Sequence, residues 1–495
     1  MNMLHRSIAS TIFLTLAILL IAAGKLPAQK SVDAAQFRTD CSILISALKV
    51  LHPGLYRYDS EEKINDHYSR LVDLREDSIS IREAFLRISE FLAQIKCGHT
   101  IANPYNQSDG IKALLFSGND KLPFTFVLIG KRMIVTEDVS GTGISRGSEV
   151  IEINRVSVEK IIGDLMKYAD GDGSNDGLRL YNMRLTGEGE QEFFDIYFPM
   201  LHAPESGKFR ITYKDPKSRA GILEKSVNAI SREERKQLLS LTSGKTDLTE
   251  EWKLEALAEG VSLLKFGTFV TYNSGLNWKQ LLRDHFNEIN FRGSSDLIID
   301  IRGNSGGTTE VAFEILSYIS DQPLTVKSVR YVCYEKVPDS LRQYLSTWDN
   351  SFYDRTANVE RYDNRLFRLN EGNSGTFTIT PKESGYRGKV YLLVDEANSS
   401  ATFILARLVK EYKLGLLAGE KTGGNLKGIT GGNLFFLDLP NTGIEIDIPL
   451  LTELTSSDAP DSGIEPDIYI EQSVEDIADG KDSGLQTLLS IIGKE

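Results

Sequence analysis

Several features that would identify other classes of protein are missing from this chain of 495 residues. Its three cysteines, Cys41, Cys97 and Cys333, are too few and too scattered for a cysteine-rich zinc site. Its net charge of −13 is the opposite of the basic surface typical of nucleic-acid-binding domains. No repeat is evident, and the phosphate-binding patterns G-x-x-x-x-G-K-S/T and G-x-G-x-x-G are absent. The sequence implies no cofactor and no metal, and the acidity identifies no partner.

Only one long hydrophobic run is present, close to the N-terminus. Residues 8–23 are almost entirely apolar, follow Arg6, and precede the small-residue ending Leu26-Pro27-Ala28. A basic start, an apolar run and such an ending are typical of a secretory signal peptide. An uncleaved anchor is the rival interpretation, but the run is shorter than the ~20 residues of a membrane-spanning helix. We therefore expect residues 1–28 to be removed, and the mature chain to be soluble and periplasmic or secreted.

Export would permit disulfide bonds. Cys41 could pair with Cys97 and leave Cys333 over, or all three could be buried thiols; the sequence leaves this open. A further alternative makes Cys97 a nucleophile beside His99, because residues two apart on a strand point to the same face.

Hydrophobic residues make up 41% of the chain and charged residues 25%, which are ordinary globular values. Residues 31–103 have the apolar spacing of helices. In this region Ser80 is a plausible N-cap with Glu83 three residues later, and Gly98 is a plausible helix stop. His99 would then lie just past the end of a helix.

The later regions differ in character. Residues 105–215 contain short β-rich runs separated by turns, and residues 216–255 are polar, as in a linker with some helix. From residue 256 strands alternate with helices, which predicts an α/β fold with a mostly parallel sheet. Strands are expected at 260–267, 296–303, 389–397 and 414–420, and helices at 277–289, 309–319 and 401–412.

Two strand-to-helix turns in this α/β region carry chemistry. The first runs from Asp300 to Gly307, where paired glycines would let backbone N–H groups approach a ligand closely and stabilise negative charge. The alternatives are phosphate binding or a tight turn in which Arg302 pairs with Asp300. The second turn includes Ser399 and Ser400. A serine at such a turn suits a nucleophile, although helix capping is the commoner role.

Together these stretches, LIIDIRGNSGG at 297–307 and VYLLVDEANSSATF at 390–403, resemble peptidase family S41. That family includes the C-terminal processing (tail-specific) proteases and the tricorn core protease. The resemblance covers about residues 256–470 and reaches the N-terminal helical region. It implies a crotonase/ClpP-like sheet with flanking helices as the catalytic core of residues 256–495, in agreement with the α/β pattern.

The resemblance also assigns the nucleophile. Ser400 falls on the reactive middle serine of the S-A-S-A-S-E stretch of the processing proteases, and Ser399 falls on an alanine. Gly306, Gly307 and the N–H of Ala401 would form the oxyanion hole.

The expected lysine base is missing. It should follow the serine by 25 residues, where this chain has Asn425, with Lys421 and Lys427 nearby. The tricorn-like branch uses histidine instead, from a segment N-terminal to the core, and Gly98-His99-Thr100 matches the G-H-T motif of related exported enzymes. A neutral imidazole can accept a serine proton at neutral pH, so we expect His99 to be the base.

Other bases and the third member of a triad stay open. His52 is a weaker candidate base, and His67, His202 and His285 lie in polar contexts. By resemblance the orienting carboxylate should stand three residues before Gly463, at Pro460. The alternatives are Asp461, Asp458 and Glu420, each of which could equally be a solvated loop charge.

Residues 146–158 resemble the PDZ stretch G-D-x-I-x-x-I-N-G-x-x-V, although Ser148 replaces its aspartate and Arg155 its glycine. PDZ domains bind extended peptides by adding a strand to a sheet edge. We therefore expect a PDZ-like domain at 105–215, with a β-rich insert of no peptide role as the alternative.

The sequence thus predicts an exported serine endopeptidase that cleaves peptides or the C-terminal regions of proteins through a Ser400 acyl-enzyme. The alternative is a non-catalytic protein that binds peptides or small hydrophobic ligands on the same fold. The substrate and the oligomeric state stay open.

Overall fold

The computed structural model describes most of the chain. The described ranges are 31–187, 192–218, 221–240, 247–272, 274–370 and 374–493. The signal peptide expected at 1–28 lies outside them. Within these ranges, no helix has both the length and the apolarity needed to cross a membrane.

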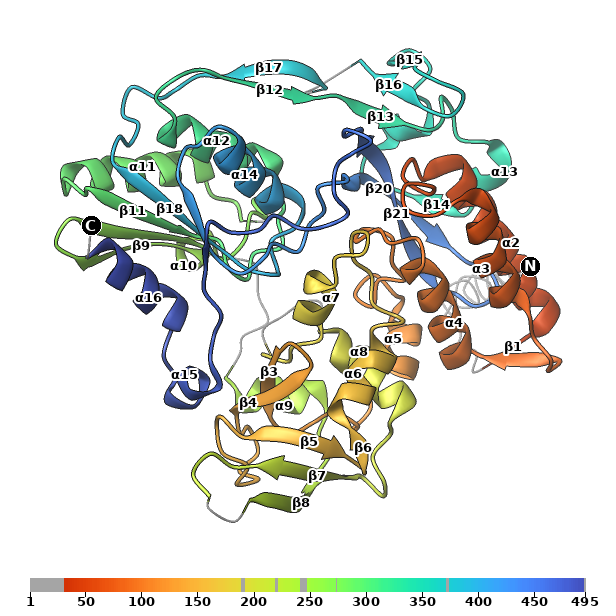
Figure 1. The fold of residues 1–495 in the computed structure, drawn as a ribbon. Coiled ribbons are helices and arrows are strands. Elements are labelled where there is room, and N and C mark those ends of the chain that lie inside the picture. Colours follow the sequence, from red (N-terminus) through yellow and green to blue (C-terminus); the bar gives the residue numbers. More distant parts are fainter. Residues whose placement is uncertain are drawn as a thin grey trace, which may run out of the picture.

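A mostly parallel six-stranded sheet forms the centre of the C-terminal half (Figure 1). Its order is β22-β19-β18-β11-β10-β9, and every neighbouring pair is parallel except β9 with β10. The predicted alternation of strands and helices is confirmed in this sheet. Its strands are β9 (Trp252–Ala258), β10 (Val261–Phe266), β11 (Asp296–Asp300), β18 (Lys389–Val394), β19 (Leu416–Gly419) and β22 (Ile468–Tyr469).

Helices cover both faces of this sheet. In β11, Leu297 and Ile299 join the hydrophobic cluster of three helices, α11, α12 and α14, whereas Ile298 between them joins a smaller cluster with Leu488 of α16. Because strand side chains alternate between faces, a run of consecutive apolar residues indicates burial on both sides. The helices are α11 (Trp278–Phe291), α12 (Thr309–Ile319), α14 (Ser400–Glu411) and α16 (Ser483–Ile492), whereas α15 (Val474–Asp479) contacts the middle region of the chain.

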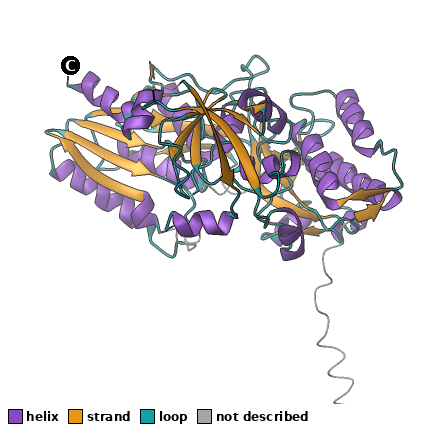
Figure 2. Cartoon of the chain, turned by 90° about the horizontal axis from the view of Figure 1, so that it is seen from below, coloured by secondary structure: helices purple, strands orange, loops and turns teal. Residues whose placement is uncertain are grey.

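The N-terminal region is helical as predicted, and in Figure 2 the end of the molecule away from the C-terminus is mainly helical. At the start of helix α4, the Oγ of Ser80 accepts the N–H of Glu83, which confirms the expected N-cap. Helix α4 ends at Ala93, earlier than the stop expected at Gly98. The residue that adopts a left-handed conformation after the helix is Lys96, with φ of 59°, and not Gly98. The elements are β1 (Ser31–Asp33), α2 (Ala34–Leu51), α3 (Glu61–Val72), β2 (Ser78–Ser80), α4 (Ile81–Ala93) and α5 (Asp109–Leu115).

A second six-stranded sheet, of order β14-β20-β21-β13-β16-β15, lies against the N-terminal helices (Figure 1). Helix α2 contacts β21, and both belong to one hydrophobic cluster. Part of the predicted catalytic core is therefore built together with the N-terminal region. These elements, with the separate pair β12 and β17, are β12 (Leu324–Ser328), β13 (Arg330–Val332), α13 (Asp339–Arg342), β14 (Leu345–Ser346), η1 (Asn350–Tyr353), β15 (Val359–Arg361), β16 (Phe367–Leu369), β17 (Gly375–Ile379), β20 (Thr430–Asp438) and β21 (Glu445–Glu453).

The middle region contains an antiparallel sheet of order β3-β4-β5-β7-β8. Strand β8 pairs with β7 along its whole length, so this sheet extends past the boundary expected at 215 into the segment expected as a linker. The elements are β3 (Thr125–Ile129), β4 (Arg132–Glu137), β5 (Glu149–Ile153), β6 (Val156–Ser157), α6 (Val158–Leu165), α7 (Gly177–Asn182), α8 (Phe193–Leu201), β7 (Lys208–Lys214), β8 (Ile222–Asn228), α9 (Arg232–Leu238) and α10 (Leu248–Glu251).

One buried carboxylate joins the N-terminal helices to the β20–β21 hairpin. Asp40 of α2 accepts four hydrogen bonds, from the backbone N–H and side chain of Asn441 and of Thr442, at 2.7 to 3.2 Å. We predict that Asp40→Ala lowers the free energy of unfolding by about 3 kcal/mol, because it leaves several buried donors unpaired. Urea unfolding of the mature chain measures this. Thr39→Ala, an exposed change on the same helix, should stay within about 0.5 kcal/mol of the parent; equal stability of the two variants would contradict the prediction.

Candidate active site

Ser400 lies at the sharp turn between β18 and α14. It is the first residue of the helix, and its φ of 48° places it in the left-handed region. For a residue other than glycine this conformation costs of the order of 1–3 kcal/mol and is concentrated at functional sites. Ser400 is partly exposed, whereas Ser399 is buried. The strained turn therefore presents the hydroxyl of Ser400 and buries its neighbour.

The paired glycines that follow β11 lie directly against this serine. Gly306 and Gly307 have φ of 119° and 132°, which favour glycine. A Cβ atom on Gly306 would lie 2.8 Å from the Cβ of Ser400, and one on Gly307 would lie 2.4 Å from the carbonyl carbon of Phe269. Only glycine fits both positions, and the backbone can approach Ser400 closely.

The backbone N–H groups of Gly306 and Gly307, both expected as oxyanion donors, point in different directions. The N–H of Gly306 donates to Asn304 Oδ1 at 2.9 Å. Phe269 donates to the carbonyl of Gly306 and accepts the N–H of Thr308, so the N–H of Gly307 points to the opposite side. Ala401 is the second residue of α14 and has no intrahelical acceptor. Gly307 and Ala401 are therefore better placed as oxyanion donors than Gly306.

Side-chain amides join the two turns. The Nδ2 of Asn398 donates to the carbonyls of Ile301 at 2.6 Å and Asn304 at 3.0 Å, and Thr402 Oγ1 also reaches Asn304. The N–H of Gly303 in turn donates to the carboxylate of Asp395. The glycine turn and the serine turn are thus one hydrogen-bonded unit.

The segment that carries His99 reaches this unit through Asp172. The N–H of Gly98 donates to Asp172 Oδ1 at 2.9 Å, and Ser399 Oγ donates to Asp172 Oδ2 at 3.3 Å. The structure therefore brings the segments of His99 and Ser400 together. Gly431 lies against the imidazole, because a Cβ there would be 3.2 Å from its Cε1 and Nε2.

Two of the three carboxylates considered as the orienting group, Asp461 and Glu420, bond to groups other than His99. Asp461 accepts from Ser174 N–H and Asn425 Nδ2, and Glu420 lies 3.9 Å from Arg184. Burial raises the pKa of Asp461, but these hydrogen bonds outweigh burial and its pKa lies below the usual value. Burial raises the pKa of Glu420.

Asp458, the third alternative, bonds to neighbouring serines in its own loop. Within the described residues, His99 Nδ1 is buried without a hydrogen-bond partner. The structure therefore gives the imidazole no third member of a triad from these three carboxylates.

Asn425, which stands where the processing proteases have their lysine base, has a structural role. Buried Asn425 donates to the carbonyl of Asp172 and to Asp461. Lys421 pairs with Glu465 at 2.5 Å, and the Nζ of Lys427 lies 5.8 Å from the ring centre of Tyr58. No recorded interaction of the described residues joins either lysine to Ser400.

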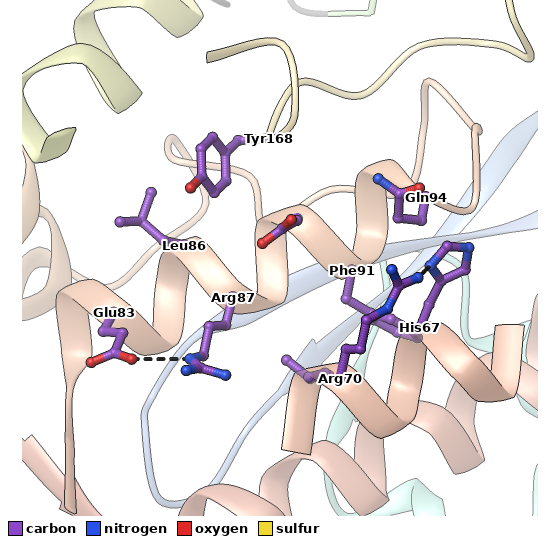
Figure 3. A pocket seen from close by; sticks show the side chains of 10 residues that line it. His67, Arg70, Glu83, Leu86, Arg87, Phe91, Gln94 and Tyr168 are labelled. Atoms are coloured by element: carbon purple, nitrogen blue, oxygen red, sulfur yellow. Dashed lines mark hydrogen bonds and ion pairs between the residues drawn. The ribbon is translucent and has the colours of Figure 1, made fainter. Parts of the chain in front are cut away.

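The other histidines have different surroundings. His52 is fully buried, and its Nε2 already bonds to Thr100 Oγ1 at 2.7 Å. Figure 3 shows His67 beside Arg70 in a cavity of about 420 Å³ lined mainly by α3 and α4. His202 stacks on Phe198 and belongs to the middle region. His285 lies in α11 and lines a cavity with Trp252 and Lys253 of β9. We therefore keep His99 as the candidate base, because its segment is bonded to the serine turn through Asp172.

All three cysteines are free thiols in the structure. Cys97 is buried, and burial raises its pKa to about 12, which disfavours the thiolate that a cysteine nucleophile needs. The described residues also contain no cluster of three or more metal-ligating side chains.

A cavity of about 870 Å³ lies at the carboxyl ends of the parallel strands. Its walls include Gly303, Glu396 and Glu420 from the segments that follow β11, β18 and β19. Arg184 from the segment after α7 and residues 127–130 of β3 and the following turn also line it. Arg302 on its wall pairs with Asp300 and with Asp482, which confirms the pairing considered for the first turn. In sheets of this kind, ligands bind at the carboxyl ends of strands.

The family model of peptidase family S41 matches residues 261–470. Residues 261–470 belong to peptidase family S41. The chain is thus a serine-type peptidase, and its S41 segment contains both turns described above. His99 and Asp172 lie outside this segment, so the match does not include the base expected from the sequence. No curated protein sequence matches the chain.

Solved structures support the fold over almost the whole chain. Mature CPAF complexed with lactacystin has a TM-score of 0.60 at 15% identity, with 93% of this chain and 97% of that chain covered. The photosystem II D1 C-terminal processing protease aligns with a TM-score of 0.39 at 14% identity, with 91% and 98% covered. At this identity the first likeness shows a shared fold, and it covers far more of the chain than the S41 segment alone.

The environment of His52 predicts a pH dependence of stability. Burial, with a smaller contribution from Arg365, lowers its pKa to about 3. In the unfolded chain this histidine binds a proton near pH 6.5. The contribution of neutral His52 to the free energy of unfolding is therefore fully present above that pH, and it falls by about 1.4 kcal/mol per pH unit below it.

His52→Gln removes this titration and can still bond to Thr100. Urea unfolding at pH 7 and pH 5 should therefore show the parent losing about 2 kcal/mol more than the variant over this interval. The same pH dependence in both proteins would mean that His52 is not held neutral.

Proposed function

We propose that this chain is an exported serine endopeptidase in which Ser400 forms an acyl-enzyme and His99 is the general base. The observation that carries the proposal is the strained turn of Ser400, with Gly306 against it and Asp172 between the neighbours of Ser400 and His99. A serine presented on a strained strand-to-helix turn suits a nucleophile. The S41 core is proposed to be of the crotonase/ClpP type.

In the proposed reaction, His99 takes the proton of Ser400 Oγ as this oxygen attacks a peptide carbonyl. The negative charge that develops on the carbonyl oxygen is stabilised by the N–H group of Gly307, in the turn after β11, and by that of Ala401, at the N-terminus of α14. The protonated imidazole then gives its proton to the leaving amine. Water attacks the acyl-enzyme with His99 again as base, and the acid product leaves with Ser400 restored.

The middle region supports a peptide substrate. We infer that it is PDZ-like and that an extended peptide adds to the open edge of β3. Phe126 uses this edge to pair with Leu185, so Leu128, two residues on, directs its N–H and carbonyl the same way. Leu128 lines the cavity of about 870 Å³. A peptide bound there would lie near the carboxyl ends of the S41 strands.

Hydrolysis of an unfolded protein substrate tests the proposed chemistry. Ser400→Ala should lower kcat at least about 10⁴-fold and His99→Ala about 10³-fold or more, because a nucleophile and its base act as one unit. Lys421→Ala and Lys427→Ala are matched controls, and their kcat should stay within about twofold of that of the parent.

An active Ser400→Ala variant would refute the proposed nucleophile. Full activity of His99→Ala together with loss in a lysine variant would refute the proposed base. A folded parent protein that binds peptides without cleaving them would favour the alternative of a non-catalytic binding protein.

A further inference from the structure

The loop between α6 and α7 lies between the two segments that carry the proposed base and nucleophile. It contributes Asp172, a residue that is 1% exposed. Each carboxylate oxygen accepts from the residue immediately before one of the two reacting groups: Gly98 precedes His99, and Ser399 precedes Ser400. A single side chain therefore connects a segment near residue 98 with one near residue 400.

The loop that carries Asp172 is fixed from inside by Arg179. Its guanidinium donates to the carbonyls of Ala169 at 3.3 Å, Gly171 at 3.2 Å and Gly173 at 3.1 Å. Arg179 is itself buried, and three bonds to consecutive parts of one loop leave that loop little freedom. Asp172 thus stands on a rigid support.

The same loop is bonded on its outer side to both neighbouring segments. Gly173 donates its N–H to the carbonyl of Lys96 at 2.9 Å, three residues before His99. On the other side, Asn425 of the S41 segment donates to the carbonyl of Asp172 at 3.0 Å. The loop therefore bridges the two segments through its backbone as well as through the carboxylate.

We propose that Asp172 is a positioning residue that sets the separation and orientation of His99 relative to Ser400. This inference rests on the function proposed above. Asp172 acts through Gly98 and Ser399, and it needs no contact with substrate. Misplacement of a reacting group by about 1 Å can cost about 100-fold in rate, whereas substrate binding at a distant edge is little affected.

The test compares Asp172→Ala with Asp172→Asn in the full mature protein. The alanine variant loses both hydrogen bonds, so kcat should fall about 100-fold while KM changes less than about threefold. The asparagine variant can accept from Gly98 and donate to the Ser399 hydroxyl, so its kcat should recover to within about threefold of the parent. The pH dependence of kcat in the asparagine variant should match that of the parent. Asp164→Ala, which removes a partly exposed carboxylate near the C-terminal end of α6, is the control and should leave kcat unchanged.

Three results would overturn the inference. They are a parent-like kcat in Asp172→Ala, a rise in KM without loss of kcat, and an asparagine variant as slow as the alanine variant or with a shifted pH profile. The last would mean that Asp172 acts through its charge. If Asp172→Ala does not fold, Ser399→Ala deletes one of the two bonds. This variant should lower kcat about tenfold at unchanged KM, and a parent-like kcat would refute the positioning role.

The inference and the function it rests on fail in different ways. If Ser400→Ala and His99→Ala remain active in the same assay, the proposed function is wrong. If both are inactive and Asp172→Ala has the kcat of the parent, the proposed function stands and only the positioning role is wrong.

Discussion

The two hydrogen bonds that Asn398 donates to the carbonyls of Ile301 and Asn304 are the constraint on which the proposed site depends. They fix the turn after β18 against the turn after β11, and both strands are held by the parallel sheet. In this arrangement Gly306 lies directly against Ser400. Buried amides that use their hydrogen-bonding capacity in this way specify one geometry, since any other would leave polar groups unpaired.

The proposed base comes from another part of the molecule. His99 follows a helix whose core is shared with the second sheet, and Gly431 at the start of β20 limits the space around its ring. Asp40 fastens these helices to the β20–β21 hairpin, and Asp172 fastens the segment of His99 to the serine turn. The N-terminal region is therefore part of the proposed site.

Local patterns in the sequence predicted the parallel strands, their helices and the Ser80 cap, because period, burial and capping depend on neighbouring residues. The strand-to-helix turn at Ser400 could also be predicted, since its motif is contiguous. Asp172 could not, because its partners lie 74 and 227 residues away and no spacing marks it. The left-handed Lys96 and the extension of the middle sheet to β8 were missed for a related reason: tertiary packing decides them more than residue preference does.

The central claim is that Ser400 is an activated nucleophile. Treatment of the mature protein with a fluorophosphonate, followed by intact mass measurement and peptide mapping, tests it most directly. The account predicts a single adduct on the peptide that contains Ser400, and none in a folded Ser400→Ala variant. An adduct at another serine, or no adduct on a well-folded parent protein, would contradict it.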